Sequence, residues 1–340
     1  MEAMAVPDLT LAAQYIRHIA NFLRSMGTEV ERWLELSELN NDNLEDSSFT
    51  LSMPQFRQLM LDGIRIAREP ALGLFIGERL VARTHGFVGY AIINSRTIRE
   101  VLEVIERFLS LRISVLASSY EVHSKEVRLV LTELFPLGDI QRPVVEAVLM
   151  AIKNLIDAVS MGTCSILSAH FPFAAPDYTE LAQELLGCEV RYNQDWIGLA
   201  LPAEVLDVPL KMADPNAFEE AERICQKLLN KLEANETTTT RVRRLLLEKQ
   251  NGFPSLQATA RLLHMTPRTL HRRLTEEGTT YRAILEDVRY RLASDHLRSG
   301  HSSIEEIAYM LGYTDSANFR RAFKRWASVP PSTYRARSRL

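Results

Sequence analysis

The runs SLQATARLLHMTPRTLHRRL (residues 255–274) and SIEEIAYMLGYTDSANFRRAFKRW (residues 303–326) decide the fold of the C-terminal part of the chain. Each run predicts a short apolar helix, a turn, and a second helix with one apolar face and one arginine-rich face. The two runs can be superposed, so the same helix-turn-helix unit occurs twice. This repeat predicts an all-α domain with two helix-turn-helix units over residues 242–340.

The first unit carries signals for helix start and for burial. Ser255 can cap its first helix, and Thr266 can cap its second helix after a turn at residues 264–265. Pro267 then stands at the first helical position, where a missing amide hydrogen costs nothing. Leu270 and Leu274 lie four residues apart and therefore face inward together.

The second unit carries matching signals. Ser303 begins its first helix, Gly312 supplies a left-handed residue that ends this helix, and Asp315 caps the next one. The inward positions of the last helix again recur at helical spacing. They are Phe319, Phe323 and Trp326.

The outward side chains near the start of each second helix are the candidate DNA readers. A recognition helix lies in the major groove, where arginine pairs with guanine and asparagine with adenine. An arginine-covered helix on its own more often has only a solvated face, but two superposable copies favour DNA binding. His271 fits a phosphate contact or a bystander as well as a reader. The candidates are Arg268, Thr269, His271, Arg272 and Arg273 on helix 266–277, and Ser316, Ala317, Asn318, Arg320, Arg321, Lys324 and Arg325 on helix 315–326.

A helix over residues 281–297 is predicted between the two units. Ile284, Leu285, Val288 and Leu292 repeat along it every three to four residues. Its length of roughly 25 Å, with a turn at each end, suits two readers held about one DNA turn (~34 Å) apart.

The net charge of -3 conceals two oppositely charged parts. Residues 241–340 contain 19 lysines and arginines against nine acidic residues, whereas residues 1–240 contain 21 against 34. A basic domain suits phosphate contact, and DNA repels an acidic one. We therefore expect residues 1–234 to form a sensing or oligomerisation domain.

Length and composition limit the classes of protein to which the chain can belong. The length of 340 residues suits two domains, and three scattered cysteines fit a reducing cytoplasm. No run of 18 apolar residues and no basic segment leading into an apolar one is present, so we expect neither a membrane span nor a signal peptide. Neither His85 nor His170 has a second ligand at metal-binding spacing, and the chain lacks a phosphate loop and a serine elbow. We expect no enzyme, no cofactor and no metal.

Helices and strands interleave irregularly in the N-terminal domain, which predicts an α+β fold and not a parallel doubly wound one. Two glycines, Gly86 and Gly89, indicate close packing or unusual backbone angles. The expected linker covers residues 235–241, and the next helix begins at Val242. Helices are predicted at residues 9–24, 30–36, 54–68, 97–109, 143–161, 176–186 and 214–234, and strands at 113–117, 127–131, 165–171 and, as two short strands, 189–201.

The C-terminal domain resembles the AraC/XylS family of bacterial transcription regulators. The resemblance rests on GY (residues 312–313), NFRRAFKRW (318–326) and PPSTYR (330–335). It implies two helix-turn-helix units on a rigid linker helix in a regulator, usually an activator, that contacts RNA polymerase near a promoter. Ala317, where a serine is common, and ASV at residues 327–329, where a turn with glycine is usual, depart from the pattern.

The N-terminal domain resembles the "arabinose-binding" domain of a subgroup of this family, and not a cupin barrel. The resemblance covers residues 20–215 and rests on HGFVGY (85–90), SRT (95–97), HFP (170–172) and ADP (213–215). It implies sensing of a small-molecule effector, which it does not identify, and a homodimer.

Two questions remain open from the sequence, and a third alternative, an enzyme fusion, is remote. The N-terminal domain either holds an effector in a shielded cavity or is a pocket-free interaction module. The apolar stripe of residues 214–234 either seals its own domain or contacts a second copy. A DNA-repair alkyltransferase fusion requires four cysteines on zinc, which three cysteines cannot supply.

Overall fold

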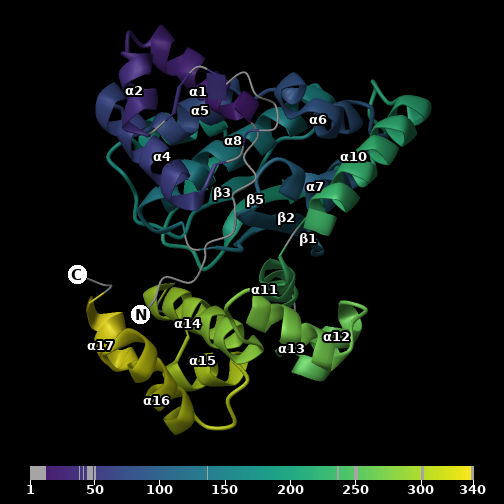
Figure 1. Ribbon diagram of the computed structural model, residues 1–340. Coiled ribbons are helices and arrows are strands. Elements are labelled where there is room, and N and C mark those ends of the chain that lie inside the picture. The colour runs from purple at the N-terminus through teal and green to yellow at the C-terminus, as the bar shows by residue number, and fades with distance from the viewer. Residues whose placement is uncertain are drawn as a thin grey trace. The chain divides into compact units, whose positions relative to one another are not determined.

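The computed structural model describes residues 13–37, 39–40, 42–43, 49, 51–135, 137–235, 237–248, 252–299 and 302–337. The chain divides into two compact units between Ala234 and Asn235 (Figure 1). In the described residues, no helix combines the length and the apolar character that a membrane span needs.

The N-terminal unit contains a five-stranded sheet in the order β1-β2-β5-β3-β4. Neighbouring strands are antiparallel except β3 and β4, which are parallel, so the predicted α+β class is confirmed. The first two strands pair as predicted, with Tyr120 opposite Leu129. The strand expected from Ile113 begins only at Leu116, because the Ile113 amide donates to the Leu109 carbonyl (3.0 Å) and prolongs the preceding helical turn. The strands are β1 (Leu116–Val122), β2 (Glu126–Glu133), β3 (Ser168–His170), β4 (Glu189–Arg191) and β5 (Ile197–Pro202).

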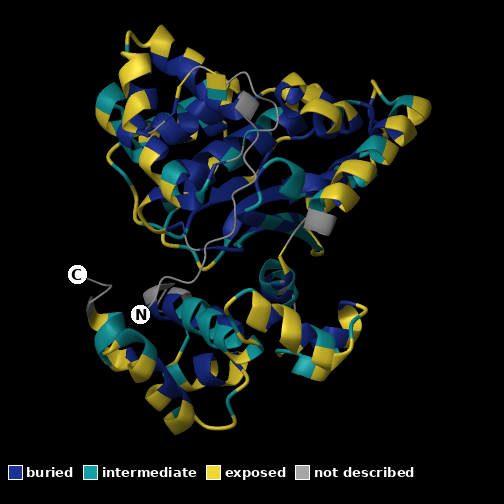
Figure 2. Ribbon diagram, viewed as in Figure 1, coloured by how far each residue is buried: buried dark blue, intermediate teal, exposed yellow. Residues whose placement is uncertain are grey.

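Helices form the other layer of this unit, and their inner faces are buried (Figure 2). The closest packing joins α5 to α8, because two glycines of α5 leave no room for a side chain. A Cβ atom at Gly73 would lie 2.4 Å from the Pro143 carbonyl oxygen, and one at Gly77 would lie 2.6 Å from that of Ala147. The helices are α1 (Ala13–Ser25), α2 (Val30–Leu36), α4 (Met53–Ala67), α5 (Leu72–Arg79), α6 (Gly86–Ile93), α7 (Ile98–Phe108), α8 (Gln141–Ser160), α9 (Thr179–Leu186) and α10 (Pro215–Asn235).

Gly86 and Gly89 both have the role that the sequence predicts. Gly86 adopts a φ of 57°, and a Cβ atom at Gly89 would lie 1.9 Å from the Ala82 carbonyl oxygen. The short 3-10 helix at Ala82–His85 therefore packs directly on α6.

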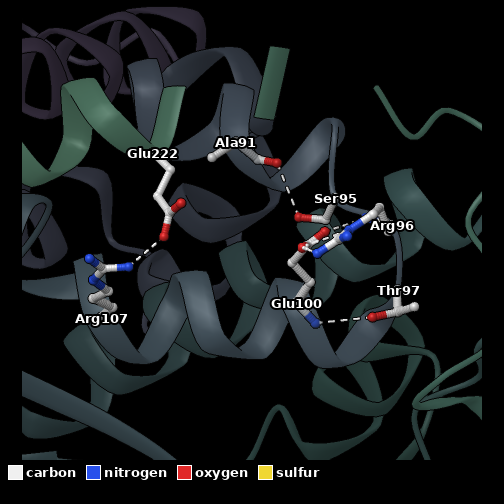
Figure 3. Close-up of polar contacts among 7 residues, drawn as sticks. All are labelled: Ala91, Ser95, Arg96, Thr97, Glu100, Arg107 and Glu222. Carbon is white, nitrogen blue, oxygen red and sulfur yellow. Dashed lines mark hydrogen bonds and ion pairs between the residues drawn. The ribbon is translucent and has the colours of Figure 1, made fainter. Parts of the chain in front are cut away.

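Polar contacts join α10 to its own unit (Figure 3). Arg107 of α7 forms an ion pair with Glu222 and donates to Gln226 (2.6 Å), while Thr97 caps α7 by accepting from the Glu100 amide. On the apolar side of α10, Leu228 is 44% exposed. Four other side chains are buried, so this part of the stripe seals the unit to which it belongs. They are Phe218, Ala221, Cys225 and Leu229.

The C-terminal unit is all-helical where it is described, as predicted. Its helices are α11 (Thr238–Glu248), α12 (Leu256–Leu262), α13 (Pro267–Glu276), α14 (Tyr281–Ser299), α15 (Ile304–Met310), α16 (Ser316–Ala327) and α17 (Pro331–Arg337).

The helix expected at Val242 begins four residues earlier, at Thr238, inside the predicted linker. The reason is a carboxylate distant in sequence. Glu277 accepts hydrogen bonds from the amides of Thr238 and Thr239, both at 2.7 Å, and from the Thr239 hydroxyl at 2.6 Å. These bonds cap amides that a helix leaves unpaired at its first turn.

The C-terminal unit has two separate hydrophobic cores that meet along α14. The first half of α14 contributes Ile284 and Val288 to a core with α11, α12 and α13. The second half contributes Ala293 and Leu297 to a core with α15 and α16. Each helix-turn-helix unit is therefore fixed to a different half of one continuous helix.

Candidate nucleic-acid interface

The first helix-turn-helix unit consists of α12 and α13. Ser255 caps α12 by accepting from the Ala258 amide (3.2 Å), and Thr266 caps α13 by accepting from the Thr269 amide (3.1 Å). The turn between them is held by a bond from the Met265 amide to the Ala260 carbonyl (2.8 Å). All three caps and turns lie where the sequence predicts them.

The second unit, α15 and α16, repeats this construction with one residue more in its turn. Ser303 begins α15 in a reciprocal capping box with Glu306, and Asp315 caps α16 by accepting from the Asn318 amide (2.7 Å). Equivalent positions of the two units are 48 residues apart in the first helices and 49 apart in the second. Thr314 is the added residue.

The equivalent turn positions are His264 and Gly312, and both have positive φ angles, of 54° and 74°. A left-handed backbone suits glycine and strains other residues. The geometry of the turn is therefore kept in the first unit although the glycine is absent. Ser328, in the segment without the usual glycine, ends α16 with a φ of 61° in the same way.

The buried and exposed positions of both second helices follow the predicted pattern. Leu270 and Leu274 of α13 and Phe319 and Phe323 of α16 are buried, and Trp326 is only partly so. Of the candidate readers, Thr269 and Ser316 are half-buried. The other ten are exposed: Arg268, His271, Arg272, Arg273, Ala317, Asn318, Arg320, Arg321, Lys324 and Arg325.

Asn318 and Arg321 are held to each other at the start of α16. The Arg321 guanidinium donates to the Asn318 side-chain oxygen (2.6 Å), and the Asn318 side-chain amide donates to the Asp315 carboxylate. Among the described residues, the contact of the Arg272 guanidinium on α13 is an exposed ion pair with Glu276 (3.3 Å). Arg272 can therefore reorient at little cost in free energy. Asn318 can pair with a base only by giving up its bonds to Arg321 and Asp315.

Arg325 also has a partner, which the sequence does not predict. Its guanidinium lies 2.9 Å from the Glu286 carboxylate on α14, which also accepts from Arg282 at 3.0 Å. Burial alone would raise the pKa of Glu286, but hydrogen bonding to Arg282 and the charge of Arg325 hold this pKa below its usual value. Glu286 therefore fixes α16 to α14 in its charged form.

A hollow of about 570 Å³ lies between α14 and the start of α16. It is bordered by four arginines, Arg282, Arg289, Arg321 and Arg325. Arg289 is held there by stacking over the rings of Phe253 and Tyr313, at 5.2 and 4.8 Å. The sequence predicts only a spacer role for α14. The seven-residue interval between Arg282 and Arg289, which places both on one helical face, is the sequence signal that could identify these residues.

His170 and the three cysteines have the surroundings of structural residues. His170 is buried, stacks on Trp196 at 4.0 Å between ring centroids and bonds with the Ser168 hydroxyl at 2.9 Å. Burial raises the pKa of each of Cys164, Cys188 and Cys225 to about 11, which disfavours reactive thiolates. Throughout the described ranges, no three histidine, cysteine or acidic side chains converge as in a metal site.

Sequence comparisons agree with both halves of this geometry. Residues 27–210 match the family described as the arabinose-binding domain of AraC transcription regulators, N-terminal, and residues 259–337 match a helix-turn-helix domain. The chain belongs to the AraC family of transcription regulators. As such it is a DNA-binding regulator with an arabinose-binding-type N-terminal domain, as the sequence predicts.

The chain is similar to relatives over nearly its whole length and to another over its C-terminal part alone. The ornithine utilization regulator of Pseudomonas aeruginosa is 32% identical over 94% of this chain and 95% of its own length. The crystal structure of the transcriptional regulator CdpR from the same organism, at 25% identity, covers 95% of this chain and 98% of that chain with a TM-score of 0.50. The urease operon transcriptional activator of Escherichia coli is 37% identical over 84 residues, 25% of this chain and 28% of its own length.

Proposed function

We propose that this AraC-family regulator reads two successive major grooves on one face of a DNA duplex, one with α13 and the next with α16. The observation that carries the proposal is the division of α14 between two cores, each with one helix-turn-helix unit. At 19 residues, α14 is about 28 Å long. This length suits reading helices separated by one turn of B-form DNA, ~34 Å.

The proposed base readers are the exposed side chains nearest each cap. Arg268, His271 and Arg272 take this role in α13, and Asn318, Arg320 and Arg321 take it in α16. Arginine is suited to the O6 and N7 acceptors of guanine and asparagine to adenine. The proposed interface also includes Thr269, Arg273, Ser316, Ala317, Lys324 and Arg325. Of these, Arg325 is paired with Glu286 in the structure.

Hydroxyl-radical footprinting of the full-length chain on its own promoter region tests this proposal. Two protected segments about one helical turn apart on one face of the DNA are expected. A single protected segment, or two on opposite faces, contradicts it.

Matched substitutions at Arg272 then separate base reading from phosphate contact. Arg272→Ala is expected to weaken binding to the cognate site by about 1 to 3 kcal/mol and to relax preference at one base pair. Arg272→Lys keeps the charge but cannot pair bidentately, so it should relax the same preference. If Arg272→Lys binds every sequence as tightly as the wild type, Arg272 contacts only phosphate.

The proposed regulatory role is activation through RNA polymerase by a cytoplasmic, nucleoid-associated homodimer without enzymatic activity. The name of the Escherichia coli relative supports activation. The test is in vitro transcription from the footprinted promoter with purified polymerase, alongside light scattering for the dimer. Reduced transcript with bound regulator would make it a repressor.

The N-terminal unit is proposed to control DNA binding by sensing a small molecule, as opposed to serving only as an interaction module. An apolar cavity of about 100 Å³ in its helical layer supports this choice. A ligand found to bind there should change the footprint or the transcript level. If it changes neither, the cavity is not regulatory.

A further inference from the structure

The helical layer of the N-terminal unit contains an apolar cavity of about 100 Å³. Side chains of α1, α4, α5, α6 and α8 form most of its wall, among them Ile19, Phe56, Met60, Ile92 and Leu155. These five are all buried. An engineered apolar cavity of roughly 150 Å³ accepts benzene. The cavity of this unit is smaller, so it suits a narrow aliphatic chain.

Three polar side chains lie together in the wall of this cavity. Arg112 donates through Nε to the Tyr15 hydroxyl (3.0 Å) and through Nη1 to the His85 backbone carbonyl (3.1 Å). The Tyr15 hydroxyl lies 2.8 Å from Nδ1 of His85. The three come from α1, from the short helix before α6, and from the turn after α7, so the fold assembles them.

The direction of these bonds determines where the His85 hydrogen lies. A guanidinium has no acceptor, so Arg112 donates to the tyrosine oxygen. Of the two groups in contact with the tyrosine hydroxyl, Nδ1 of His85 is the one that can accept its hydrogen, and this bond satisfies that buried hydrogen. Burial, together with the charge of Arg112, lowers the pKa of His85 to about 4, so the ring is neutral at pH 7. Its hydrogen therefore lies on Nε2.

Nε2 of His85 is a buried donor without a partner. The side chain is only 6% exposed, and none of the described groups accepts a hydrogen bond of normal geometry from Nε2. Interaction with the Leu80 carbonyl raises the pKa of His85 part of the way back, but this contact does not have the geometry of a normal hydrogen bond to Nε2. Buried polar groups in native proteins are almost always hydrogen-bonded, so this atom calls for an acceptor in the cavity.

The charge around the cavity is one-sided. Arg112 is the cation in its wall, and within the described part of the chain no carboxylate lines the cavity or pairs with this guanidinium. A ligand with an anionic end would satisfy both the donor on His85 and the charge of Arg112. A ligand with ammonium groups would find neither an acceptor nor a counter-charge there.

We propose that this cavity is the effector site and that it takes a small molecule with an aliphatic body and one carboxylate end, of the class of short-chain aliphatic carboxylates. The carboxylate would accept from Nε2 of His85 and lie against Arg112, with its chain among Ile19, Phe56 and Leu155. The inference rests on the proposed sensing function. It differs from what the family description and the name of the Pseudomonas aeruginosa relative suggest, because a sugar or a diamino acid has polar groups that this wall leaves unpaired.

The test measures ligand binding to the full-length chain in the absence of DNA. Calorimetry gives the affinity, and the melting temperature reports stabilisation of the folded state. Butyrate, hexanoate and octanoate are the probes, and 1-hexanol, arabinose and ornithine are the comparison compounds. At least one carboxylate should raise the melting temperature, because a ligand that binds only the native state stabilises it. Hexanol lacks the carboxylate and cannot form the charged hydrogen bonds, so it should bind at least about tenfold more weakly than hexanoate. Arabinose and ornithine should give no shift.

Substitutions in and outside the cavity wall test whether the ligand binds in this cavity. His85→Phe and Arg112→Met should weaken carboxylate binding about tenfold or more, while His123→Phe and Arg57→Met, whose side chains lie outside the cavity wall, should leave it unchanged. Ala151→Leu fills the cavity from α8 and should abolish binding in a folded protein. This variant remains decisive if Arg112→Met fails to fold.

Three results would overturn the proposal. The first is no response of the wild type to any carboxylate at millimolar concentration, the second is a response that persists in Ala151→Leu, and the third is binding of arabinose or ornithine that Ala151→Leu abolishes. The last result would keep the cavity as a site but reject the ligand class. Footprinting of the same samples reports DNA binding separately, so failure of this inference is distinguishable from failure of the proposed function.

Discussion

The carboxylate of Glu286 on α14 lies 2.9 Å from the guanidinium of Arg325 on α16. This ion pair joins the spacer helix to the second recognition helix, and it places a negative charge beside the arginine-bordered hollow. We therefore expect both the strength and the specificity of DNA binding to depend on this contact.

Glu286→Ala should make DNA binding tighter but less selective. Removal of the carboxylate frees Arg325 for phosphate and loosens α16 on α14, so non-specific affinity should rise. The slope of log K against log salt should steepen by about 0.9 for each additional phosphate contact. Fluorescence anisotropy on cognate and random duplexes over a salt series measures both effects.

Glu305→Ala is the control for Glu286→Ala. It removes an exposed charge of the same sign from α15, so it should affect cognate and random DNA alike. An equal loss of selectivity in both variants would show that general charge, and not the Arg325 contact, is responsible.

Glu277→Gln should loosen the first turn of α11. The carboxylate caps the Thr238 and Thr239 amides, and loss of such a cap costs about 1 kcal/mol. Amide exchange at residues 238–241 should then be about fivefold faster, as followed by mass spectrometry. Glu276→Gln, at the adjacent exposed position, should leave these rates unchanged, and equal rates in both variants would exclude the cap.

The Glu277 cap should also depend on pH. Burial would raise the pKa of Glu277, but the hydrogen bonds from Thr239 and Thr238 outweigh it and lower the pKa below its usual value. The cap therefore contributes its full stability above about pH 4.5, and this contribution disappears as the pH falls through the lowered pKa. Protection of residues 238–241 that does not change between pH 7 and pH 3 would contradict this.

Glu146→Gln should stabilise the N-terminal unit at alkaline pH. Burial raises the pKa of Glu146 to about 7, against a hydrogen bond from Tyr178. The folded state thus holds this proton more tightly than the unfolded state, so stability falls as pH rises from about 4.5 to 7. The glutamine variant has no proton to lose at this position. Its free energy of unfolding should therefore exceed that of the wild type by at most about 3 kcal/mol at pH 8 and differ little from it at pH 4.

Urea unfolding of the full chain at pH 4 and pH 8 measures this difference. Glu184→Gln changes an exposed side chain on α9 and should follow the wild type at both pH values. If Glu146→Gln has the same pH dependence as the wild type, the buried carboxyl group is not the cause.

Gly89→Ala should destabilise the N-terminal unit by about 2 kcal/mol or more, because the new Cβ atom would lie 1.9 Å from the Ala82 carbonyl oxygen. Gly162→Ala is the matched control, since Gly162 has a φ of 86° but no neighbouring atom within 4 Å. Only backbone strain of about 1 kcal/mol is expected there. Melting temperatures compare the two, and an equal loss would rule out close packing at Gly89.

The sequence by itself determined the local features of this protein. Caps such as Ser255, Thr266 and Asp315, the left-handed Gly312, and the spacing of Leu270 and Phe319 specify two helix-turn-helix units, because a cap and a helical stripe depend only on residues a few positions apart. The alternation in Val127, Leu129 and Leu131 likewise predicts a strand and its pairing.

Only the tertiary structure decided the contacts between residues distant in the chain. Glu277 reaches back to extend α11 to Thr238, Glu286 takes Arg325 as a partner, and Tyr15, His85 and Arg112 meet at one cavity although the outer two are 97 positions apart. No periodicity encodes such pairs, since folding brings together side chains whose separation along the chain is arbitrary. The helix-turn-helix units can therefore be predicted from the sequence, whereas the site that we propose for the effector forms only when the helices pack together.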